Sequence, residues 1–358
     1  MSEALFRKVE AQVLQRNKDE DIKASEFEIL TATAFDIFTQ ENVEVAVVEV
    51  GMGGRDDATN VLKTKDLTII TRIGLDHQSF LGDTIEEIAR HKCGIFVKDV
   101  PVLYNASNEK PVITVIEEEA EVIGATPTWP IKASADLSDL PTTAWKDFAK
   151  SLRHREQQKL AINQAWRAFR YMHHLLRLDD KASSRSAESL RHNVDIITHL
   201  QWPGRLQHLD IHALVPNAGE ILLDGAHNAQ AARALADVVS NELRGPKSNK
   251  SITWVIASTN GRPVKDLLGP LLAPGDRVAA VEFGPVDGMP WVQAQPSNDI
   301  EQVVKNEYPE METRTYGRDI QAALSWAAST RAQVVVTGSL YLASDLLRIL
   351  RDAGGNIV

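Results

Sequence analysis

Along the first part of the chain, segments whose apolar positions recur at helical spacing alternate with short β-branched runs. Ser25 and Glu28 form a capping-box pattern, and apolar positions at helical spacing then predict a helix over about 26–41. Residues 43–50 are a β-branched run, which is typical of a strand buried on both faces. Residues 67–74 have the same character. The start of the chain reads as a further soluble helix.

The same alternation continues downstream. We expect a helix from Thr84 to about Lys98, a strand at 100–105, a helix at 108–123, an extended segment at 128–133, a loop at 134–144, and helices at about 156–178 and near 185–199. Strand–helix–strand order indicates a mostly parallel sheet.

The pattern restarts after the segment WPGR at 202–205. We expect strands near 206–212, 220–224, 251–257, 277–283 and 333–337, and helices near 228–243, 298–307 and 317–330. This order indicates a second doubly wound unit. We therefore predict an α/β fold with a domain over residues 1–200 and another over 201–358.

Composition narrows the function classes. The 358 residues carry 39 Lys and Arg against 49 Asp and Glu, a net charge of −10, which argues against nucleic acid as the main partner. The single cysteine, Cys93, excludes an internal disulfide and favours a reducing compartment, so we interpret it as a small core residue. No apolar run approaches the roughly 18 residues that span a bilayer, so we expect no membrane partner.

The first candidate site follows the predicted strand at 43–50. Glu49 ends that strand, and Gly51, Gly53 and Gly54 come directly after it. A buried carboxylate needs a cation or hydrogen bonds, so a metal or an arginine is implied there. The glycines would let a phosphate or a substrate approach the backbone, although a lone glycine-rich turn is more often structural.

The second candidate site is the segment GLDH at the end of the next strand. Asp76 and His77 could reach an ion shared with Glu49, and their oxygen and imidazole ligands permit Mg²⁺ or Mn²⁺. Alternatively, Asp76 caps a turn and His77 pairs with a backbone carbonyl. Lys92, sixteen residues after Asp76, would by itself be an ordinary surface lysine.

The third candidate site lies in the second half of the chain. Asp224 ends a predicted strand, while His227 and Asn228 open a helix whose N-terminus attracts anions. Asp224 could accept hydrogen bonds from ribose hydroxyls, and His227 could face phosphate; a capped turn is the alternative. Arg205, after a tight Pro-Gly turn, offers a fixed fork to phosphate.

Six segments together are more specific than any one of them. They are, in order, SEFEILTATAFDIF, VEVGMGGRDDATNV, GLDHQSFLGDTIEEIARHKCGIF, WPGRLQ, LLDGAHN and TGSLYL. This set resembles the folylpolyglutamate synthase and dihydrofolate synthase family of the Mur ligase superfamily. The resemblance implies a P-loop-ATPase-like domain followed by a smaller Rossmann-like domain, in agreement with the two predicted units.

The resemblance also implies a chemistry. A folate or pteroate carboxylate is phosphorylated by ATP, and the amino group of L-glutamate then attacks the acyl phosphate. Glu49 and His77 resemble Mg²⁺ ligands, and Lys92 resembles a lysine that is carbamylated to hold a second metal. Arg205, Asp224, His227 and Asn228 resemble nucleotide contacts. Such a protein is expected to act as a cytoplasmic monomer on small molecules, with a mitochondrial form left open.

Within the family, the segments DGAHN and WPGRLQ look more like dihydrofolate synthases, which would make 7,8-dihydropteroate the acceptor. A folylpolyglutamate synthase acting on tetrahydrofolate is the alternative. An NAD-dependent oxidoreductase is disfavoured because no G-x-G-x-x-G follows a first strand.

The chain departs from the family pattern in two places. It contains no G-x-x-x-x-G-K-[ST], the loop that cradles phosphates, and no pterin-binding segment after it. We expect that an N-terminal portion is lacking, which would leave a central strand unpaired, reduce solubility and allow a catalytically silent protein. Gln157, Gln158 and Ala161 replace a family His-Gln and asparagine, so the adenine contacts are unassigned, and Asn163 is not a substitute.

Overall fold

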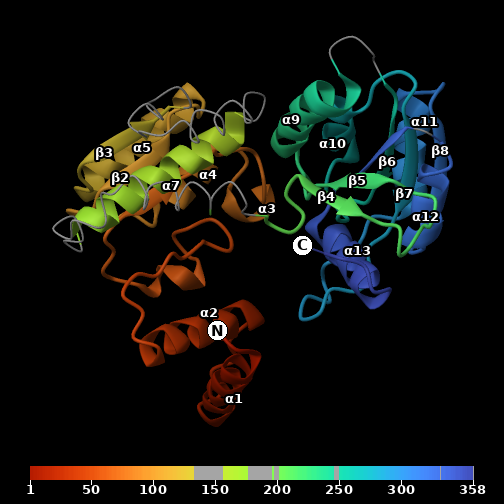
Figure 1. Cartoon of the computed structure of the whole chain (residues 1–358). Helices are drawn as coiled ribbons and strands as arrows, with labels where there is room; N and C mark the ends of the chain where they lie inside the picture. The colour runs from red at the N-terminus through yellow and green to blue at the C-terminus, as the bar shows by residue number, and fades with distance from the viewer. Residues whose placement is uncertain (133–155, 176–195, 197–200, 246–249, 331, 358) are drawn as a thin grey trace. The chain divides into compact units, whose positions relative to one another are not determined.

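The computed structural model describes residues 1–132, 156–175, 196, 201–245, 250–330 and 332–357 (Figure 1). These residues separate into two compact units. The first contains the described residues up to 132 together with most of the helix at 156–175, and the second contains those from 201 onward. Each unit is described by itself below.

The sheet of the first unit is small and parallel. Its strands are β1 (Thr68–Ile70), β2 (Val102–Asn105) and β3 (Thr128–Ile131), in the order β1-β2-β3. β1 has only three residues, and Thr68 is in register with Val102 of β2. β2 pairs along its whole length with β3. The central strand of this unit is therefore β2, whose residues are all buried.

Helices cover both faces of this sheet. α4 (Ile85–Cys93) and α5 (Lys110–Ile123) pack on one face, where they bury a cluster that includes Ile88 and Val102. α7 (Glu156–Leu175) packs on the opposite face, where the Gln164 Nε2 donates a hydrogen bond of 3.0 Å to the Ile70 carbonyl. This is the three-layer α/β arrangement expected from the sequence.

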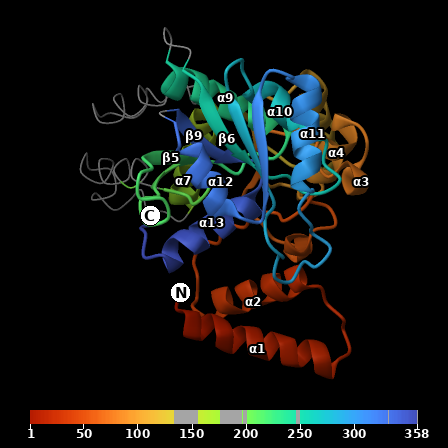
Figure 2. The same cartoon turned by 90° about the vertical axis from the view of Figure 1, so that its right-hand side faces the viewer.

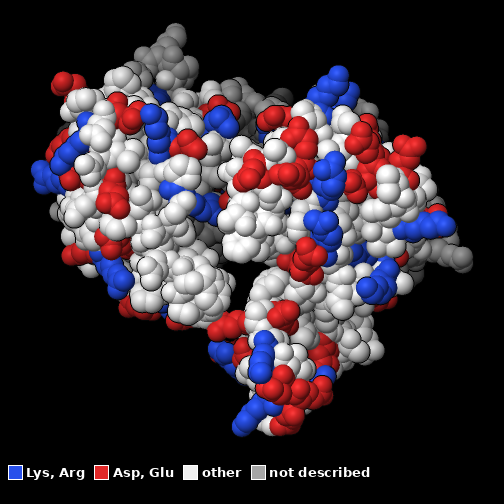
Figure 3. Space-filling view, turned by 180° about the vertical axis from the view of Figure 1, so that it is seen from behind, with Lys and Arg blue, Asp and Glu red and all other residues white. Residues whose placement is uncertain are grey.

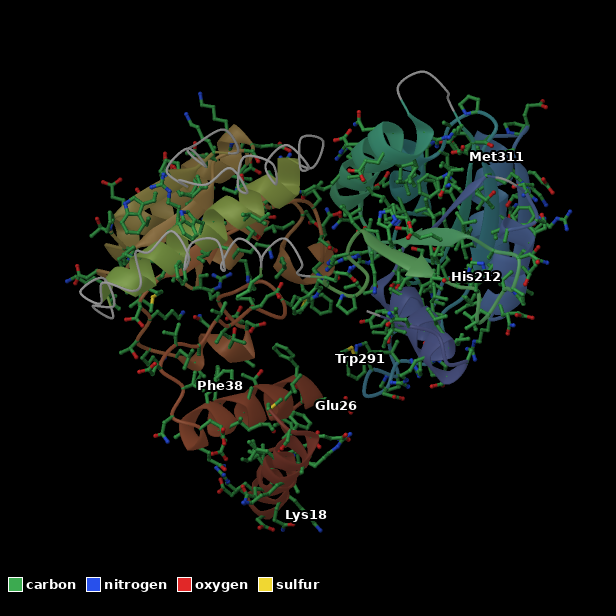
Figure 4. The ribbon with its side chains drawn as sticks, viewed as in Figure 1. Lys18, Glu26, Phe38, His212, Trp291 and Met311 are labelled. Carbon is green, nitrogen blue, oxygen red and sulfur yellow. The ribbon has the colours of Figure 1, made fainter. Side chains whose placement is uncertain are left out.

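A helical hairpin begins the chain. α1 (Glu3–Asp19) and α2 (Glu26–Gln40) pack against each other around a small core made of Val9, Val13, Ile29 and Ile37. Ser25 and Glu28 form the predicted capping box at the start of α2. Figure 4 shows Glu26 and Phe38 near the two ends of α2, and Lys18 in the last turn of α1. Both predicted helices are confirmed.

The prediction of a buried strand at 43–50 is wrong. Residues 45–50 are irregular, and most of this segment is exposed, including Val47 at 93%. A β-branched run becomes a strand only where neighbouring strands accept its backbone hydrogen bonds. In the part of the first unit that the structure describes, β1 pairs with β2 alone. The predicted strand at 67–74 is likewise reduced to three residues.

The second unit has a larger sheet. Its strands are β4 (Gln207–Asp210), β5 (Glu220–Leu223), β6 (Ile252–Ile256), β7 (Arg277–Val281), β8 (Glu312–Gly317) and β9 (Gln333–Thr337). Their order is β4-β5-β9-β6-β7-β8, and only β4 runs antiparallel to its neighbour. The five strands predicted for this unit are confirmed. The polar strand β8 was not predicted because its residues do not alternate as apolar and polar.

The six-stranded sheet lies between two helical layers (Figure 2). α9 (Ala229–Val238), the π-helical segment Val239–Arg244, α10 (Val264–Leu271) and α11 (Ser297–Glu307) lie on one face, and α12 (Ile320–Ala327) and α13 (Leu340–Asp352) on the other. The sequence predicted neither α10, which contains Gly269 and Pro270, nor α13. The α/β fold class is confirmed.

One buried ion pair organises the second unit. The Asp276 carboxylate, which is fully buried, accepts two hydrogen bonds from the Arg244 guanidinium, at 2.7 and 2.5 Å. It also accepts from the backbone amides of Ile252 and Ala273 and from the Trp254 indole. The acceptor capacity of this buried carboxylate is thus used in full, as buried charge requires.

The boundary near residue 200 stays a prediction, because residues 176–195 and 197–200 lie outside the described residues, as do the loop at 134–144 and most of the helix near 185–199. Among the described helices, none is long and apolar enough to span a bilayer. On the face seen in Figure 3, acidic and basic side chains are interspersed.

Candidate functional site

The glycine-rich segment 51–57 of the first unit rests against the last turn of α4. Gly53 has φ +72°, and a Cβ built on it would lie 2.5 Å from the His91 Nδ1. A Cβ on Gly54 would lie 2.6 Å from the Lys92 carbonyl oxygen, and a Cβ on Gly51 would collide with the Phe27 ring. The glycines therefore let the backbone approach helices α2 and α4, which is a structural role that the sequence left open.

Asp57 orders the same segment from within. Its Oδ2 accepts the Met52 amide at 2.8 Å, and its Oδ1 accepts the amide and hydroxyl of Thr59 at 2.9 and 2.6 Å. Asp57 thereby caps the 3₁₀ helix at Ala58–Val61. The sequence analysis did not single out Asp57, although an Asp followed two residues later by Thr at a helix start is a recognisable capping signal.

Two polar side chains brace this loop against the end of α4. The Asn60 Nδ2 donates to the carbonyls of Arg55 and Gly94, both at 3.0 Å. The Lys65 ammonium donates to the Asn60 Oδ1 at 2.6 Å and to the Ile95 carbonyl at 2.8 Å. Burial lowers the Lys65 pKa. Segments thirty or more residues apart are thus joined by side-chain hydrogen bonds, which sequence spacing alone does not show.

Asp76 and His77 lie at the start of a short helix, α3 (Gln78–Leu81). His77 adopts a left-handed conformation with φ +53°, and the Asp76 Oδ1 accepts its amide at 2.9 Å. The His77 Nε2 lies 3.9 Å from the same Asp76 oxygen. Asp76 therefore caps a turn, which was the structural alternative for this residue.

Lys92 is a half-buried residue rather than an ordinary surface lysine. It lies in the last turn of α4. Burial lowers the Lys92 pKa, whereas the negative charges of Asp76 and Asp57 act in the opposite direction. The structure therefore brings Lys92 near two carboxylates from separate loops. The neighbouring Cys93 is fully buried, as predicted, and burial raises its thiol pKa to about 12.

The proposed metal ligand Glu49 is exposed. The sequence argument for a metal assumed that this carboxylate is buried and needs a cation to offset the cost of burial. Because Glu49 is exposed, that argument no longer supports the assignment. Among the described residues, no three His, Cys, Asp or Glu side chains gather as a metal-binding group. The shared ion between Glu49 and His77 remains a prediction.

In the second unit, the turn at 202–205 is joined to the end of β5. The Gly225 amide donates to the Gly204 carbonyl at 2.8 Å, and the Asp224 Oδ2 accepts the Leu206 amide at 2.9 Å. A Cβ on Gly225 would lie 2.9 Å from the Arg205 Nη1. The exposed Arg205 thus lies beside the DGAHN loop.

Asp224 has the environment of a buried acid. Burial raises the Asp224 pKa, while hydrogen bonds from the amides of Leu206 and Ala226 and the charges of Arg205 and His227 act to lower it. Both carboxylate oxygens accept backbone amides in this structure. The structure therefore gives Asp224 the turn-capping role that was the alternative to contact with ribose.

His227 and Asn228 open helix α9. The His227 Nδ1 donates to the Gly225 carbonyl at 2.8 Å, and the Asn228 Oδ1 accepts the Ala231 amide at 2.9 Å as the N-cap. The Arg262 Nη1 donates to the His227 carbonyl at 3.1 Å. Arg262 follows β6 and was not predicted, because its proximity depends on the strand order rather than on sequence spacing.

Adjacent strands explain this cluster. β5, β9 and β6 are neighbours in the sheet, so the loops that follow their carboxyl ends share one edge. Asp224 follows β5, Gly338 follows β9 with φ +102°, and Arg262 follows β6. Arg205 and Arg262 bring positive charge to this edge, and His227 lies beside them at a helix N-terminus, an arrangement that suits a phosphate group.

A separate surface groove of about 270 Å³ lies along α10. Its lining includes Arg233 of α9, Lys265 and Gly269 of α10, and Glu307 and Tyr308 at the end of α11. The predicted site residues do not line it. We therefore assign the chemistry to the loops at the strand ends.

Comparison with known proteins identifies the family. Residues 207–349 match the family model "Dihydrofolate synthetase, C-terminal domain", and residues 5–144 match "Mur ligase middle domain". The chain is 39% identical to a probable dihydrofolate synthetase of Schizosaccharomyces pombe, over 98% of this chain and 81% of that protein. The chain belongs to the dihydrofolate synthetase and folylpolyglutamate synthase family. The resemblance inferred from the six sequence segments is thus confirmed.

Further relatives and solved structures agree with this family. A dihydrofolate synthetase of Saccharomyces cerevisiae is 33% identical over 96% of this chain and 80% of its own length. The folylpolyglutamate synthase of Mycobacterium tuberculosis complexed with ADP has a TM-score of 0.74 at 23% identity, over 99% of this chain and 78% of that one. At this identity the likeness shows the fold of the family.

Proposed function

We propose that this chain is a dihydrofolate synthase, which joins L-glutamate to 7,8-dihydropteroate at the expense of ATP. The chain belongs to a family of ATP-dependent folate–glutamate ligases, so its reaction class is amide formation between an acid and an amino acid. One observation carries the narrower choice of acceptor: the near-full-length identity of 39% is to a probable dihydrofolate synthetase. The match to a dihydrofolate synthetase C-terminal model supports it.

The proposed reaction has two steps. A pteroate carboxylate oxygen attacks the γ-phosphorus of ATP, and ADP leaves with its bridging oxygen, giving an acyl phosphate. The neutral amino group of glutamate then attacks the acyl carbon, loses a proton, and expels inorganic phosphate. Neither step needs a protein nucleophile, so the residues act by positioning and by offsetting negative charge.

We assign the phosphate contacts of the second unit to Arg205 and His227. Both lie beside the N-terminus of α9, whose free amides favour an anion. We assign Asp224 to the ribose side of the nucleotide, with Asn228 nearby as the helix cap. Because the backbone already uses both Asp224 oxygens, a ribose hydroxyl would have to share one of them.

We assign the divalent cation to Glu49, His77 and Lys92 of the first unit. Carbamylation requires the neutral amine, and burial lowers the Lys92 pKa toward that form. The oxygen and imidazole donors suit Mg²⁺ or Mn²⁺. A bifunctional folylpolyglutamate synthase/dihydrofolate synthase that is 20% identical to this chain was solved with Mn, AMPPNP and L-glutamate bound. When bound, the ion would offset charge on the transferring phosphoryl group.

A direct assay tests the acceptor. Purified chain is incubated with Mg-ATP, radiolabelled glutamate, and either dihydropteroate or tetrahydrofolate. The same assay is run on the chain joined to an N-terminal segment that carries the family loop GTNGKGS. Dihydrofolate as the main product supports the proposal. Product from tetrahydrofolate alone would favour the polyglutamate synthase, and no product from either protein would contradict ligase activity.

Matched variants test the assigned residues. We expect His227→Ala and Lys92→Ala each to lower kcat/KM by about 100-fold, because each removes a charge or ligand that acts on the transferring group. His212→Ala and Lys98→Ala remove exposed side chains of the same type and should leave kcat/KM within about twofold. Calorimetric titration with Mg-ATP separates a silent protein, which would release no binding heat, from a ligase.

We also propose that the protein acts as a cytoplasmic monomer on small molecules. Sedimentation equilibrium and cell fractionation test this; a human relative is named as mitochondrial, so that compartment is the other outcome.

A further inference from the structure

His91 is a buried side chain that the proposed reaction does not use. It lies in the last turn of α4, directly before Lys92, and is only 9% exposed. Its Nε2 donates to the Asp56 Oδ2 at 3.1 Å. Its Nδ1 is buried and has no hydrogen-bond partner within the described residues. A leucine would fill the same space without leaving a polar nitrogen unsatisfied, so packing alone does not account for this residue.

The ring of His91 lies against the glycine loop. The nearest atom to a Cβ built on Gly53 is the His91 Nδ1, at 2.5 Å, and the next is a methyl of Leu81 at 2.7 Å. Gly53 is therefore held directly over the imidazole. The bond from Nε2 to Asp56 holds the same loop three residues further on. One ring thus contacts the loop at two points.

The main chain of His91 contacts the loop at a third point. The Arg55 amide donates to the His91 carbonyl at 3.0 Å. Gly54 lies against the neighbouring Lys92 carbonyl, as described above. The loop and the lysine-bearing turn are therefore in contact over several consecutive residues, with the imidazole as the buried side chain between them.

We infer that His91 is a positioning residue that keeps loop 51–57 and Lys92 at a fixed spacing. The inference rests on the proposed function, in which Lys92 is one of the residues that hold the divalent cation. Reacting groups must be held to a fraction of an ångström, and a displacement of about 1 Å can lower a rate about 100-fold. The imidazole sets this spacing because it lies between the loop backbone at Gly53 and the backbone of α4. Only glycine at position 53 allows the loop to come this close to the ring.

Activity measurements distinguish positioning from packing. We expect His91→Ala to lower kcat about tenfold with less than a threefold change in the KM for ATP, measured well below the melting temperature. His91→Gln, whose amide can still donate to Asp56, should recover most of the lost kcat. Arg90→Ala is the matched control: Arg90 is the preceding residue and pairs with Glu119 on the outer surface at 3.0 Å. A kcat for His91→Ala equal to that of Arg90→Ala would overturn the inference.

Hydrogen exchange tests the same inference without activity. The Arg55 amide reports whether the loop stays on the helix turn, so His91→Ala should make it exchange at least tenfold faster than in Arg90→Ala. Equal exchange in the two variants would overturn the inference. If the unmodified chain forms no product while the exchange result is as expected, the proposed function fails and the role of His91 in positioning the loop stands.

A double-mutant cycle gives a second check. Gly53→Ala should lower the melting temperature more in the unmodified chain than in the His91→Ala background, because two of the three atoms nearest to the added Cβ belong to the imidazole. Additive shifts would contradict the proposed contact.

Discussion

The two units of this protein differ in whether a β-branched run in the sequence forms a strand in the structure. In the second unit, β6 is a run of five fully buried residues that pairs with β9 on one side and β7 on the other. In the first unit, the β-branched run at 43–50 is irregular, and Val47 is 93% exposed. A β-branched run therefore shows a preference for extended structure, and pairing partners on both edges decide whether that preference is realised.

The largest expected effect concerns the buried ion pair between Arg244 and Asp276 in the second unit. Asp276→Ala leaves the Arg244 guanidinium buried without a counter-charge and three donors without an acceptor, so the free energy of unfolding should fall by about 3–5 kcal/mol. Urea unfolding, followed by hydrogen exchange in each unit, measures this. Only amides of the second unit should lose protection.

The control for this variant is an exposed ion pair. Asp352→Ala breaks the contact with Arg351, where both side chains are more than 60% exposed, and should cost less than about 1 kcal/mol. Equal losses for Asp352→Ala and Asp276→Ala would mean that the buried pair does not stabilise the unit.

A pair of valine substitutions compares β2 of the first unit with the irregular run at 43–50 directly. Val102→Ala in β2 removes two methyl groups from a fully buried position and should cost about 2 kcal/mol. Val47→Ala removes the same atoms from an exposed position and should cost less than about 0.5 kcal/mol. Chemical denaturation measures both. A large loss for Val47→Ala would show that residues 43–50 are buried in solution and would restore the original strand prediction.

Helix caps should respond alike in the two units. Thr84→Ala removes the acceptor of the Glu87 amide in α4, and Asp319→Ala removes that of the Ala322 amide in α12. Each should cost about 1 kcal/mol, because the interaction is local and does not depend on the sheet. Thermal unfolding measures both, with Thr84→Ser as the control that keeps the hydroxyl. Unequal losses would show that the surrounding unit alters the cap.

The smallest expected effect concerns pH. Burial lowers the pKa of Lys92 in the folded chain below 10.5, its ordinary value in the unfolded chain. At pH values between the folded-state pKa and 10.5, the unfolded chain therefore binds more protons than the folded chain. Stability should therefore rise as the pH increases through that alkaline range toward 10.5. Lys92→Met should remove this rise, whereas Lys8→Met, at an exposed position of α1, should keep it. Urea titrations between pH 7 and about 10 measure the slope; an unchanged slope in Lys92→Met would contradict the burial of this ammonium.

The candidate site could be predicted where its signals are local. Asp224 at a strand end, Asn228 at a helix start, and the Thr84–Glu87 capping box are each recognisable within a few residues, and the structure forms all three local features. Asp57, Asn60, Lys65, His91 and Arg262 were not predicted as site residues. Asp57 carried a local capping signal that the sequence analysis passed over, whereas each of the other four has a partner thirty or more residues away, as in the bond from Asn60 to Gly94, so no pattern within a short window signals them.

Sequence by itself determined the family, the α/β class, most of the described helices, and five of the six strands of the second unit, because capping, periodicity and turn chemistry act over a few residues. Tertiary structure alone decided which of the apolar runs became strands and which polar residues brace the glycine loop. It also placed Lys92 in a half-buried position near Asp76 and Asp57. The physical reason is that burial and hydrogen-bond pairing are relations between distant segments, and the chain specifies them only when those segments meet.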